Sequence, residues 1–366
     1  MYLATPLYVA TPVDVRVRPG DSQVEAAVTQ EVTQAVTQAV TQEMTETVAQ
    51  TMASDVCRIC GQAGGEVFHA REMMFGLREE FAYFQCPNCR CLQIRDIPED
   101  LARHYPDNYY SLHAPLTQPS AVGRWRWWLE GKLRRSVLNA GRGRRSRIFH
   151  WMRRTNTSFT SAILDVGCGR GKLLHELSLF GFRDLTGADP FVAGELRYAS
   201  GVVVHQCELS ALERRFDLIM MHHTFEHVPD PKGTLVAARE RLEPGRFLLL
   251  RIPVADCHAW QKYGVHWFAL DAPRHLYLHT EKSIRWLAEQ TGLTLTGVEW
   301  DSGAHQFWGS EQYLNDIPHR SPRSHEDNPR GSMFSRADLR RFERESRQLN
   351  AAGQGDSACF YLQRAP

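Results

Sequence analysis

The chain has 366 residues, a formal net charge of +1 at neutral pH and nine cysteines. This length can hold two or three domains, and the near-zero charge gives no overall electrostatic case for binding nucleic acid. The first twenty residues lack the basic start and apolar core of a secretory signal, and no apolar run is long enough to span a bilayer. These features favour a cytoplasmic protein, in which cysteines bind metals or remain thiols more often than they form disulfides.

Residues 27–50 repeat a four-residue unit around Val-Thr-Gln. A period of four drifts against the helical period of 3.6 residues, so no straight apolar face forms. Valine and threonine are also poor helix formers. We therefore expect residues 1–54 to be disordered or marginally helical, with a self-associating helix as the alternative. Met52 raises the further possibility that translation naturally begins there.

Two Cys-x-x-Cys pairs follow, Cys57 with Cys60 and Cys86 with Cys89, separated by residues 61–85. Each pair presents two thiolates toward one point, and two pairs complete a closed tetrahedral Zn²⁺ site. The aromatic run over 81–84 predicts a strand of a zinc ribbon that covers residues 55–100. Redox cysteines, or Cys91 in place of one ligand, are the alternatives.

Residues 101–160 contain a tyrosine-rich link and then a basic stretch over 124–154, in which Glu130 is the only acid. Its tryptophans are Trp125, Trp127, Trp128 and Trp151. The stretch suits a helix pair whose tryptophans pack on the core, or an interfacial helix on an anionic membrane surface. It also suits a nucleic-acid backbone, although the zinc ribbon is the only accompanying motif of that kind, so nucleic acid is the least favoured partner.

An apolar run over 163–166 is followed by Gly167-Cys168-Gly169-Arg170-Gly171 and then by a helical pattern. Strand, glycine turn and helix together mark a nucleotide-type site at the carboxyl end of a parallel strand. Lys172 stands where a dinucleotide fingerprint has its third glycine, which argues against a nicotinamide cofactor.

Further apolar runs predict strands over 185–189, 202–205, 216–221 and 246–250, with helical spacers over 192–200 and 231–242. Strands that alternate with helices predict a doubly wound, mostly parallel α/β sheet. The run over 357–362 reads as a last strand, antiparallel to one over 293–298. The core domain would therefore cover 161–304 plus 351–366, and residues 305–350 would be an insertion with a polar loop and one helix over 336–349.

The segments DVGCGRG, GADP, FDLIMMHHTFEHVPDP and LEPGRFLLL resemble the successive motifs of class I S-adenosylmethionine-dependent methyltransferases. The resemblance implies a seven-stranded Rossmann-like sheet and S-adenosylmethionine as the cofactor. It implies that Asp165, Gly167 and Gly169 hold the methionine end and that Asp189 holds the ribose. The full set of implied cofactor residues is Asp165, Gly167, Cys168, Gly169, Gly171, Asp189, Pro190, Cys207, Glu208, Leu209 and His222.

A zinc ribbon ahead of this core resembles the zinc-containing sugar methyltransferases, including enzymes that act on nucleotide-linked deoxysugars. This resemblance implies methylation of a hydroxyl or carbon on a nucleotide- or lipid-linked saccharide, as in polysaccharide biosynthesis. Two alternatives are methylation of RNA and a non-catalytic module that only binds the cofactor. The oligomeric state cannot be read from the sequence.

The segment 266–276 resembles the part of those enzymes that closes over the acceptor, which makes His275 the candidate base. Histidine titrates near neutrality and suits proton removal from a hydroxyl or an acidic C–H group. Arg274 beside it could hold an anionic group of the acceptor. Glu226 and His227, at the end of the fourth strand, are rival catalytic residues.

A second interpretation of this segment is structural. Asp271 and Arg274 could form a local ion pair while His275 packs against the sheet. In the functional interpretation, the wall of the acceptor site would come from Trp260, Trp267 and Tyr277.

Overall fold

The computed structural model describes residues 56–105, 116, 119–136 and 144–366. The chain divides into two units, 1–54 and 55–366, and the description below concerns the second. The repeat of residues 27–50, Met52 and the tyrosines at 109 and 110 lie outside the described residues, so the expectations for them stay predictions.

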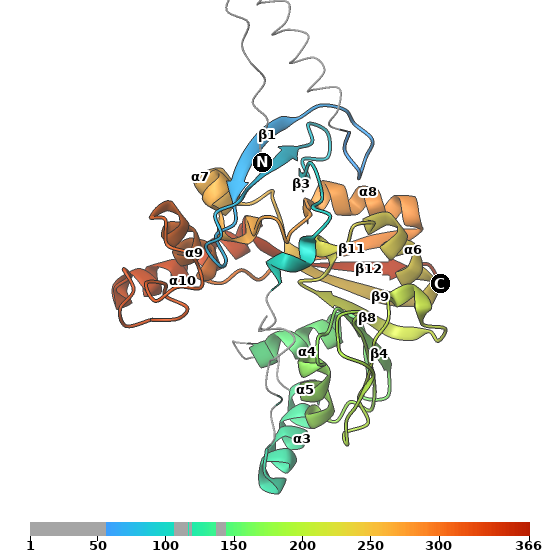
Figure 1. The fold of residues 1–366 in the computed structure, drawn as a ribbon. Coiled ribbons are helices and arrows are strands. Elements are labelled where there is room, and N and C mark those ends of the chain that lie inside the picture. The colour runs from blue at the N-terminus through green and yellow to red at the C-terminus, as the bar shows by residue number, and fades with distance from the viewer. Residues whose placement is uncertain (1–55, 106–115, 117–118, 137–143) are drawn as a thin grey trace, which may run out of the picture. The chain divides into compact units, whose positions relative to one another are not determined.

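The segment with the two cysteine pairs forms a small antiparallel sheet in the order β1-β2-β3-β10. Its strands are β1 (Glu66–Arg71), β2 (Glu80–Gln85), β3 (Leu92–Ile94) and β10 (Tyr277–Leu278). Strand β2 confirms the strand predicted over 81–84. Because β10 comes from a segment some 180 positions further along and pairs with β3, the ribbon and the following domain share one sheet. Figure 1 shows β1 and β3 of this small sheet above the large sheet.

The large sheet has the strand order β11-β12-β9-β8-β4-β5-β7-β6. Neighbours from β9 to β7 pair in parallel, whereas β12 is antiparallel to both β9 and β11. The strands are β4 (Ala162–Val166), β5 (Asp184–Ala188), β6 (Leu196–Arg197), β7 (Val203–His205), β8 (Phe216–His222), β9 (Leu242–Pro253), β11 (Leu293–Trp300) and β12 (Ser357–Arg364). This is the mostly parallel Rossmann-like sheet that the sequence predicts, with the short β6 as an eighth strand at one edge.

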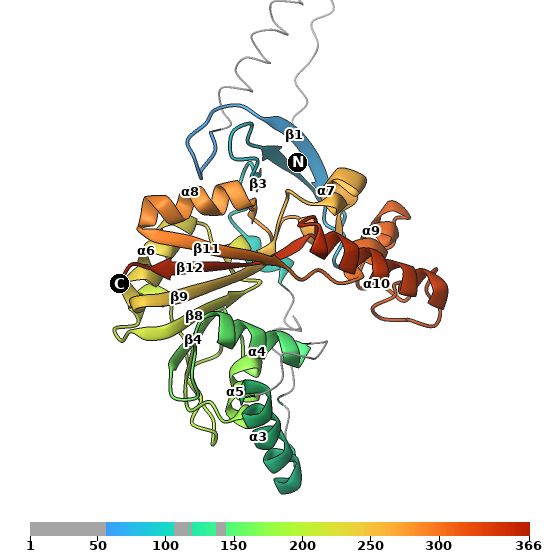
Figure 2. The same ribbon diagram turned by 180° about the vertical axis from the view of Figure 1, so that it is seen from behind.

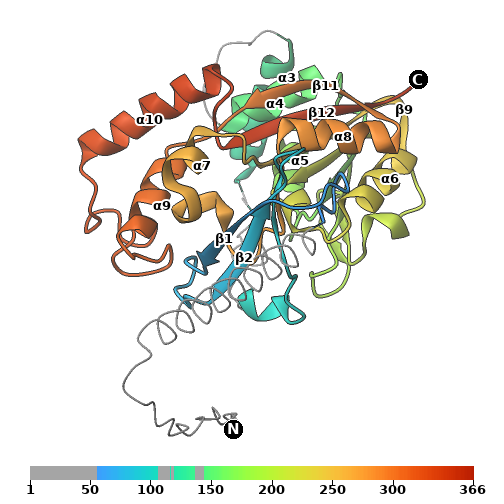
Figure 3. The same ribbon diagram turned by 90° about the horizontal axis from the view of Figure 1, so that it is seen from above.

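Helices cover both faces of this sheet (Figure 2). The α-helices are α3 (Ala121–Ser136), α4 (Arg144–Arg154), α5 (Lys172–Phe180), α6 (Pro231–Arg241), α7 (His258–Tyr263), α8 (Glu281–Thr291), α9 (His305–Leu314) and α10 (Arg336–Ala351). Short 3₁₀ turns are η1 (Leu101–His104), η2 (Leu209–Ala211), η3 (Phe225–His227), η4 (Gly264–His266) and η5 (Phe268–Leu270). Figure 3 shows α7, α9 and α10 gathered together beside one end of β11 and β12.

Two apolar cores form because successive residues of a strand point to opposite faces. On one face Leu164 and Ile219 pack with α6, α8 and the ribbon. On the other face Ile163 and Leu218 pack with α4 and α5. The α/β sandwich is therefore sealed on both sides, as expected for a parallel sheet whose strands are continuous apolar runs.

Local signals in the sequence start the helices. Asp230 accepts a hydrogen bond from the N–H of Gly233, and Pro231 occupies the first turn of α6, where its missing N–H costs nothing. Helix α8 begins with a reciprocal capping box between Thr280 and Ser283. The cap at Asp230 and the proline at 231 explain why the helix expected over 231–242 begins where α6 begins.

Three predicted elements differ from the structure. Residues 192–200 form turns and β6 rather than a helix, because Gly194 has a φ of +91° and Leu196 pairs with β7. The strand predicted over 246–250 is part of the longer β9, which already begins at Leu242. The insertion contains the predicted α10 but also α9, which the sequence analysis missed.

Candidate functional site

Strand β4 ends in a glycine turn that leads into α5. Gly167, Gly169 and Gly171 have φ values of +67°, +53° and +75°, the left-handed region that glycine adopts without steric cost. A Cβ built on Gly167 would lie 2.4 Å from the side chain of Thr224, in the loop after β8. Glycine at this position therefore lets the loops after β4 and β8 meet at the carboxyl edge of the sheet.

Two carboxyl groups lie beside this turn. Asp189 follows β5, and its Oδ2 accepts a hydrogen bond from the N–H of Gly169 at 2.7 Å, while Oδ1 accepts one from the N–H of Phe191 at 2.9 Å. Asp165 is buried on β4; burial, and then the charge of Asp189, raise its pKa to about 8. The structure thus places Asp189 at the glycine turn, where the resemblance expects a ribose-binding acid.

The remaining predicted cofactor residues lie along the same edge. Cys168 lies within the turn, Pro190 follows Asp189, and residues 207–209 follow β7. His222 is the last residue of β8, and its ring packs at 4.7 Å from that of Trp151. All are at the carboxyl ends of β4, β5, β7 and β8, where doubly wound sheets bind their ligands.

Phe191 is a residue that the sequence analysis missed. It follows Asp189 by two positions and is 80% exposed. A large ring exposed beside a predicted ribose site could stack on the adenine of a nucleotide. The pattern acid-Pro-aromatic after a buried strand was the available signal.

A buried carboxylate and two imidazoles converge beyond the end of β8. Glu226 and His227 belong to η3, and His275 follows η5; one potential ligand atom of each lies within 4.8 Å of the others. Glu226 is fully buried, and neither of its carboxylate oxygens has a hydrogen-bond partner among the residues that the structure describes. Burial alone would raise the pKa of Glu226, but His223, His227 and His275 lower it to about 2.

A cavity of about 1050 Å³ opens beside this cluster. The loop over 222–227 separates the two parts of the site, because Thr224 packs against Gly167 while His223 and His227 line the cavity. Distant segments complete the wall, and they contribute Met74 from the ribbon, Trp151 from α4, Phe268 from η5, and His305, His319 and Arg320 from the insertion. The sequence analysis did not anticipate that the ribbon and the insertion line this cavity.

Arg274 is not available to hold an acceptor. Its guanidinium is fully buried, with Nη2 at 2.6 Å from Oδ1 of Asp271 and at 3.0 Å from Oε1 of Glu72, at the end of β1. It also donates a hydrogen bond to the carbonyl oxygen of His104. The structural interpretation, in which Asp271 and Arg274 pair, is the one found, and Glu72 is an additional partner.

The expected stacking wall is also different. Trp267 and Tyr277 are fully buried, and neither they nor Trp260 line the cavity. Phe268 lines it instead, with its ring stacked at 4.0 Å on that of His305. Burial lowers the pKa of His305 to about 3, so this imidazole is neutral and acts as an aromatic surface.

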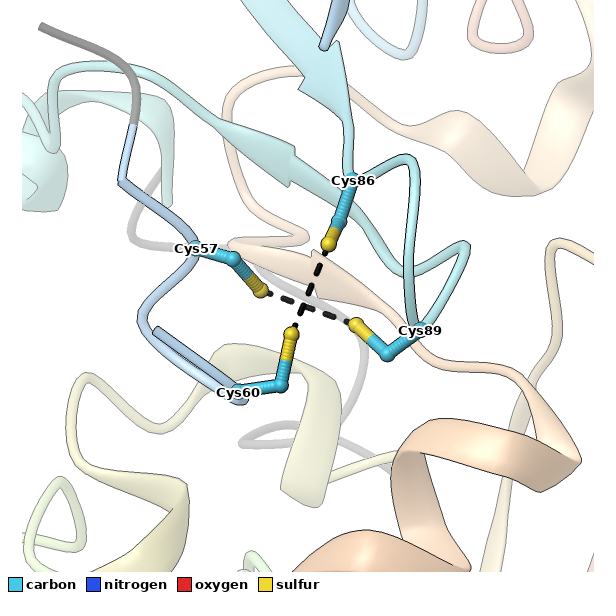
Figure 4. A group of neighbouring side chains, drawn as sticks. All are labelled: Cys57, Cys60, Cys86 and Cys89. Atoms are coloured by element: carbon cyan, nitrogen blue, oxygen red, sulfur yellow. Dashed lines mark hydrogen bonds between the residues drawn. The ribbon is translucent and has the colours of Figure 1, made fainter. Parts of the chain in front are cut away.

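The sulfur atoms of Cys57, Cys60, Cys86 and Cys89 point toward one centre (Figure 4). The Sγ atoms lie 3.6 Å apart for Cys57 and Cys89 and 3.5 Å apart for Cys60 and Cys86. Tetrahedral Zn²⁺ with Zn–S bonds of about 2.3 Å needs sulfurs about 3.8 Å apart, so the group fits the ion.

Groups around the four sulfurs also suit thiolates. Gln93 donates a hydrogen bond to the Sγ of Cys57 at 3.1 Å, and Asn88 donates one to the Sγ of Cys60 at 3.6 Å. Cys91 is buried but is not among the four converging sulfurs. The donor set could therefore hold Zn²⁺ without Cys91.

Hydrogen bonds join the ribbon to the segment that carries His275. The Tyr83 hydroxyl donates to the carbonyl oxygen of His275 at 2.8 Å. The Thr280 hydroxyl donates to the carbonyl oxygen of Cys89 at 2.6 Å, beside the sulfur cluster. The ribbon thus holds the backbone on both sides of β10, so its folding influences the placement of His275.

The basic stretch forms the two helices α3 and α4. Trp151 is buried and Trp127 packs at 4.8 Å on Phe180, but Trp125 and Trp128 are 59% and 45% exposed. Packing on the core therefore accounts for two of the four tryptophans. Within the described residues, no helix is long and apolar enough to cross a membrane.

Residues 125–298 match the family described as "Methyltransferase domain". Among curated proteins, the chain is 30% identical over 162 residues to the ubiquinone biosynthesis O-methyltransferase of Cereibacter sphaeroides, a match that covers 38% of this chain and 65% of that protein. It is 29% identical over 160 residues to the protein of that name from Pectobacterium carotovorum, covering 40% and 64%. The chain thus spans slightly less than two thirds of the length of these relatives.

Solved structures to which the chain shows some similarity include a putative sarcosine dimethylglycine methyltransferase from Galdieria sulphuraria, at 14% identity and a TM-score of 0.38, covering 60% of this chain and 86% of that one. Another is magnesium protoporphyrin IX methyltransferase from Synechocystis, at 13% identity and a TM-score of 0.38, covering 73% and 100%. Residues 125–298 thus match a methyltransferase domain, and the strand order and the glycine turn agree with the Rossmann-like fold of class I methyltransferases.

Proposed function

We propose that the protein transfers the methyl group of S-adenosylmethionine to a hydroxyl group of an acceptor bound in the 1050 Å³ cavity. The observation that carries the proposal is the loop over 222–227. It contacts the glycine turn through Thr224 on one side and lines the cavity through His223 and His227 on the other. A methyl donor at the turn would therefore face an acceptor in the cavity.

The cofactor side supplies binding and orientation. S-adenosylmethionine would lie over the glycine turn, with its ribose hydroxyls on Asp189 and its adenine against Phe191. When bound, the cofactor supplies an electrophilic methyl group, so the protein mainly has to align the acceptor and remove its proton. Asp165 lies buried on β4 just before the turn, where burial and the charge of Asp189 raise its pKa to about 8.

The acceptor side supplies proton removal. His227 and His275 line the cavity and lie close to the buried Glu226, and we assign the activation of the acceptor hydroxyl to this cluster, acting through His275. Removal of a proton by a positioned group accelerates such steps by about 10²–10⁴-fold. The neutral aromatic rings of Phe268 and His305 offer a stacking surface farther along the cavity.

For the acceptor we favour a hydroxyl of a nucleotide- or lipid-linked saccharide, because the ribbon resembles that of sugar methyltransferases and a ring can stack on the aromatic wall. The curated relatives are named O-methyltransferases of ubiquinone biosynthesis, which favours a hydroxylated aromatic acceptor as the second candidate. The exposed Trp125 and Trp128, among basic residues, support contact with an anionic membrane surface, which would suit a lipid-linked acceptor.

The test offers labelled S-adenosylmethionine together with pools of nucleotide sugars, lipid extract, hydroxylated aromatics and total RNA. We expect label to enter a small or lipid-linked hydroxyl compound. Label in RNA that falls steeply with rising salt would support the RNA alternative instead. Cofactor binding without label in any pool would support a non-catalytic module and contradict the proposal.

Two variants test the acceptor side and the cofactor side of the site separately. His275→Ala should lower turnover by about 10²–10⁴-fold while cofactor affinity stays nearly unchanged. Asp189→Ala should weaken cofactor affinity roughly ten- to a hundredfold, through loss of charge-assisted hydrogen bonds. His69→Ala, an exposed histidine on the ribbon, is the matched control and should leave both quantities unchanged.

A further inference from the structure

We propose that Glu226, His227 and His275 bind a divalent transition-metal ion at the buried end of the cavity, separate from the sulfur cluster of the ribbon. The inference rests on the proposed function only for the role of the ion. Its structural basis is the convergence of a carboxylate oxygen and two ring nitrogens within 4.8 Å of one another. Two imidazoles and one carboxylate are a donor set that suits first-row transition ions.

The first argument is the burial of the Glu226 carboxylate without a hydrogen bond among the described residues. A buried ionised group without a partner is costly, so such groups are normally paired or coordinate a metal. A cation between Glu226 and the two imidazoles would supply the missing partner.

The second argument is the orientation of the two rings. Nδ1 of His275 lies 2.7 Å from the carbonyl oxygen of Ala269, and Nδ1 of His227 lies 2.8 Å from that of Arg274. Because a carbonyl oxygen only accepts, each Nδ1 carries the proton and each Nε2 is left with a free lone pair. Metal-binding histidines commonly have this arrangement, in which a backbone carbonyl fixes the tautomer.

The third argument concerns His223, the other basic group near Glu226. Its Nδ1 lies 3.4 Å from Oε1 of Glu226, and its Nε2 contacts Nη1 of Arg251. Since a guanidinium only donates, Nε2 of His223 is the acceptor in the contact with Arg251. The contact of Nδ1 with Oε1 does not have hydrogen-bond geometry, so the oxygens of Glu226 stay available to a cation.

The ion would deepen the proposed function by selecting the acceptor. His227 and His275 line the cavity, so the coordination positions left open by three protein ligands face it. An acceptor with two adjacent oxygens, such as a vicinal diol, could fill two of them. With the ion bound, His275 would act as its ligand and not as the base: the coordinated hydroxyl would lose its proton to water, its oxygen would form the new bond to the methyl carbon, and the S–CH₃ bond would break to release S-adenosylhomocysteine.

The probe is Mn²⁺, whose preference for nitrogen and oxygen ligands separates this site from the thiolates of the ribbon. Full-length protein with its ribbon zinc in place is titrated with Mn²⁺, and free Mn²⁺ is followed by electron paramagnetic resonance. We expect one equivalent to bind, and Glu226→Gln to weaken binding by at least about tenfold. His69→Ala is the control and should bind Mn²⁺ like the wild type.

The glutamine variant keeps the size of the side chain, and unchanged cofactor affinity and circular dichroism show that it is folded. Absence of Mn²⁺ binding, or equal binding by wild type and Glu226→Gln, would overturn the site. Chelator-treated protein that retains ribbon zinc then tests the role of the ion. Full methylation by that protein would reject metal activation and leave the proposed function standing, whereas methylation restored by Mn²⁺ supports both.

Discussion

The cofactor side and the acceptor side of the loop over 222–227 are built in different ways. The cofactor side is one continuous strand, turn and helix over 162–180, joined by the acid Asp189 from the neighbouring strand. The acceptor side is assembled from the ribbon, α4, η3, the segment around His275 and the insertion. The first depends on local geometry, and the second depends on the packing of segments far apart in the chain. Mutations should therefore be able to damage one side and spare the other.

A variant in the ribbon should give the largest difference between the effect on the acceptor side and the effect on the cofactor side. Cys86→Ser removes one of four thiolates, and structural zinc sites contribute about 10–16 kcal/mol of apparent binding free energy to folding. Because Tyr83 and Cys89 are hydrogen-bonded on either side of β10, we expect zinc loss, a lower melting temperature and at least about a tenfold fall in methylation. Cofactor affinity of the folded fraction should change little.

The control for this variant is Cys91→Ser, which alters a buried ribbon cysteine outside the sulfur cluster. It should keep its zinc, as measured by elemental analysis. Zinc loss in Cys91→Ser but not in Cys86→Ser would make Cys91 the fourth ligand. Full activity of zinc-free protein would show that the acceptor side does not depend on the ribbon.

The next largest effect should come from the buried ion pairs of Arg274. Arg274→Met leaves Glu72 and Asp271 as buried charges without their partner, which costs about 3–5 kcal/mol of the free energy of unfolding. Urea denaturation measures this loss. Adding Glu72→Gln should restore part of it, because one uncompensated charge is removed; no recovery in the double variant would contradict a direct pairing.

Arg274 also shows why the acceptor side was hard to predict. Beside His275 it looked ready for an anionic acceptor, but its partner Glu72 lies 202 positions earlier in the chain. No local pattern announces a contact of that range. The glycine turn and the two cysteine pairs could be predicted because their spacing alone sets their geometry, and the mostly parallel sheet could be predicted from the alternation of strands and helices.

Within the predicted core, one error arose because strand pairing replaced a helix that the local sequence predicted. Residues 192–200 have enough apolar character for a short helix. However, Gly194 and Gly201 adopt positive φ, and Leu196 and Arg197 pair with β7. Tertiary pairing overrode a weak helical preference there. Similarly, the cluster of Glu226, His227 and His275 was predicted as a set of rivals, and only the fold shows that they converge.

On the cofactor side, a smaller effect should appear in the pH dependence of the free energy of unfolding. Asp165 has a pKa of about 8 in the folded chain and an ordinary value of 3.8 when unfolded. Between these values the folded state holds a proton that the unfolded state releases, so the free energy of unfolding falls as the pH rises from about 4 to 8. Asp165→Asn should flatten this fall and stabilise the protein at pH 8, by about 1 kcal/mol or more. An unchanged slope in denaturation measured across this range would contradict burial of a protonated Asp165.

The smallest effect on stability should come from a residue that belongs to neither side. Trp125 is 59% exposed on α3, so Trp125→Ala should change the free energy of unfolding by less than about 0.5 kcal/mol. Trp127→Ala is the matched control, and its contact with Phe180 predicts a loss of roughly 1–3 kcal/mol. Sedimentation with anionic vesicles then tests the membrane proposal. If α3 lies on a lipid surface, Trp125→Ala lowers vesicle binding although it leaves folding intact, because a tryptophan without a packing role in the fold gains its burial only at the interface. Equal vesicle binding by the two variants and the wild type would contradict the proposal that α3 contacts a membrane.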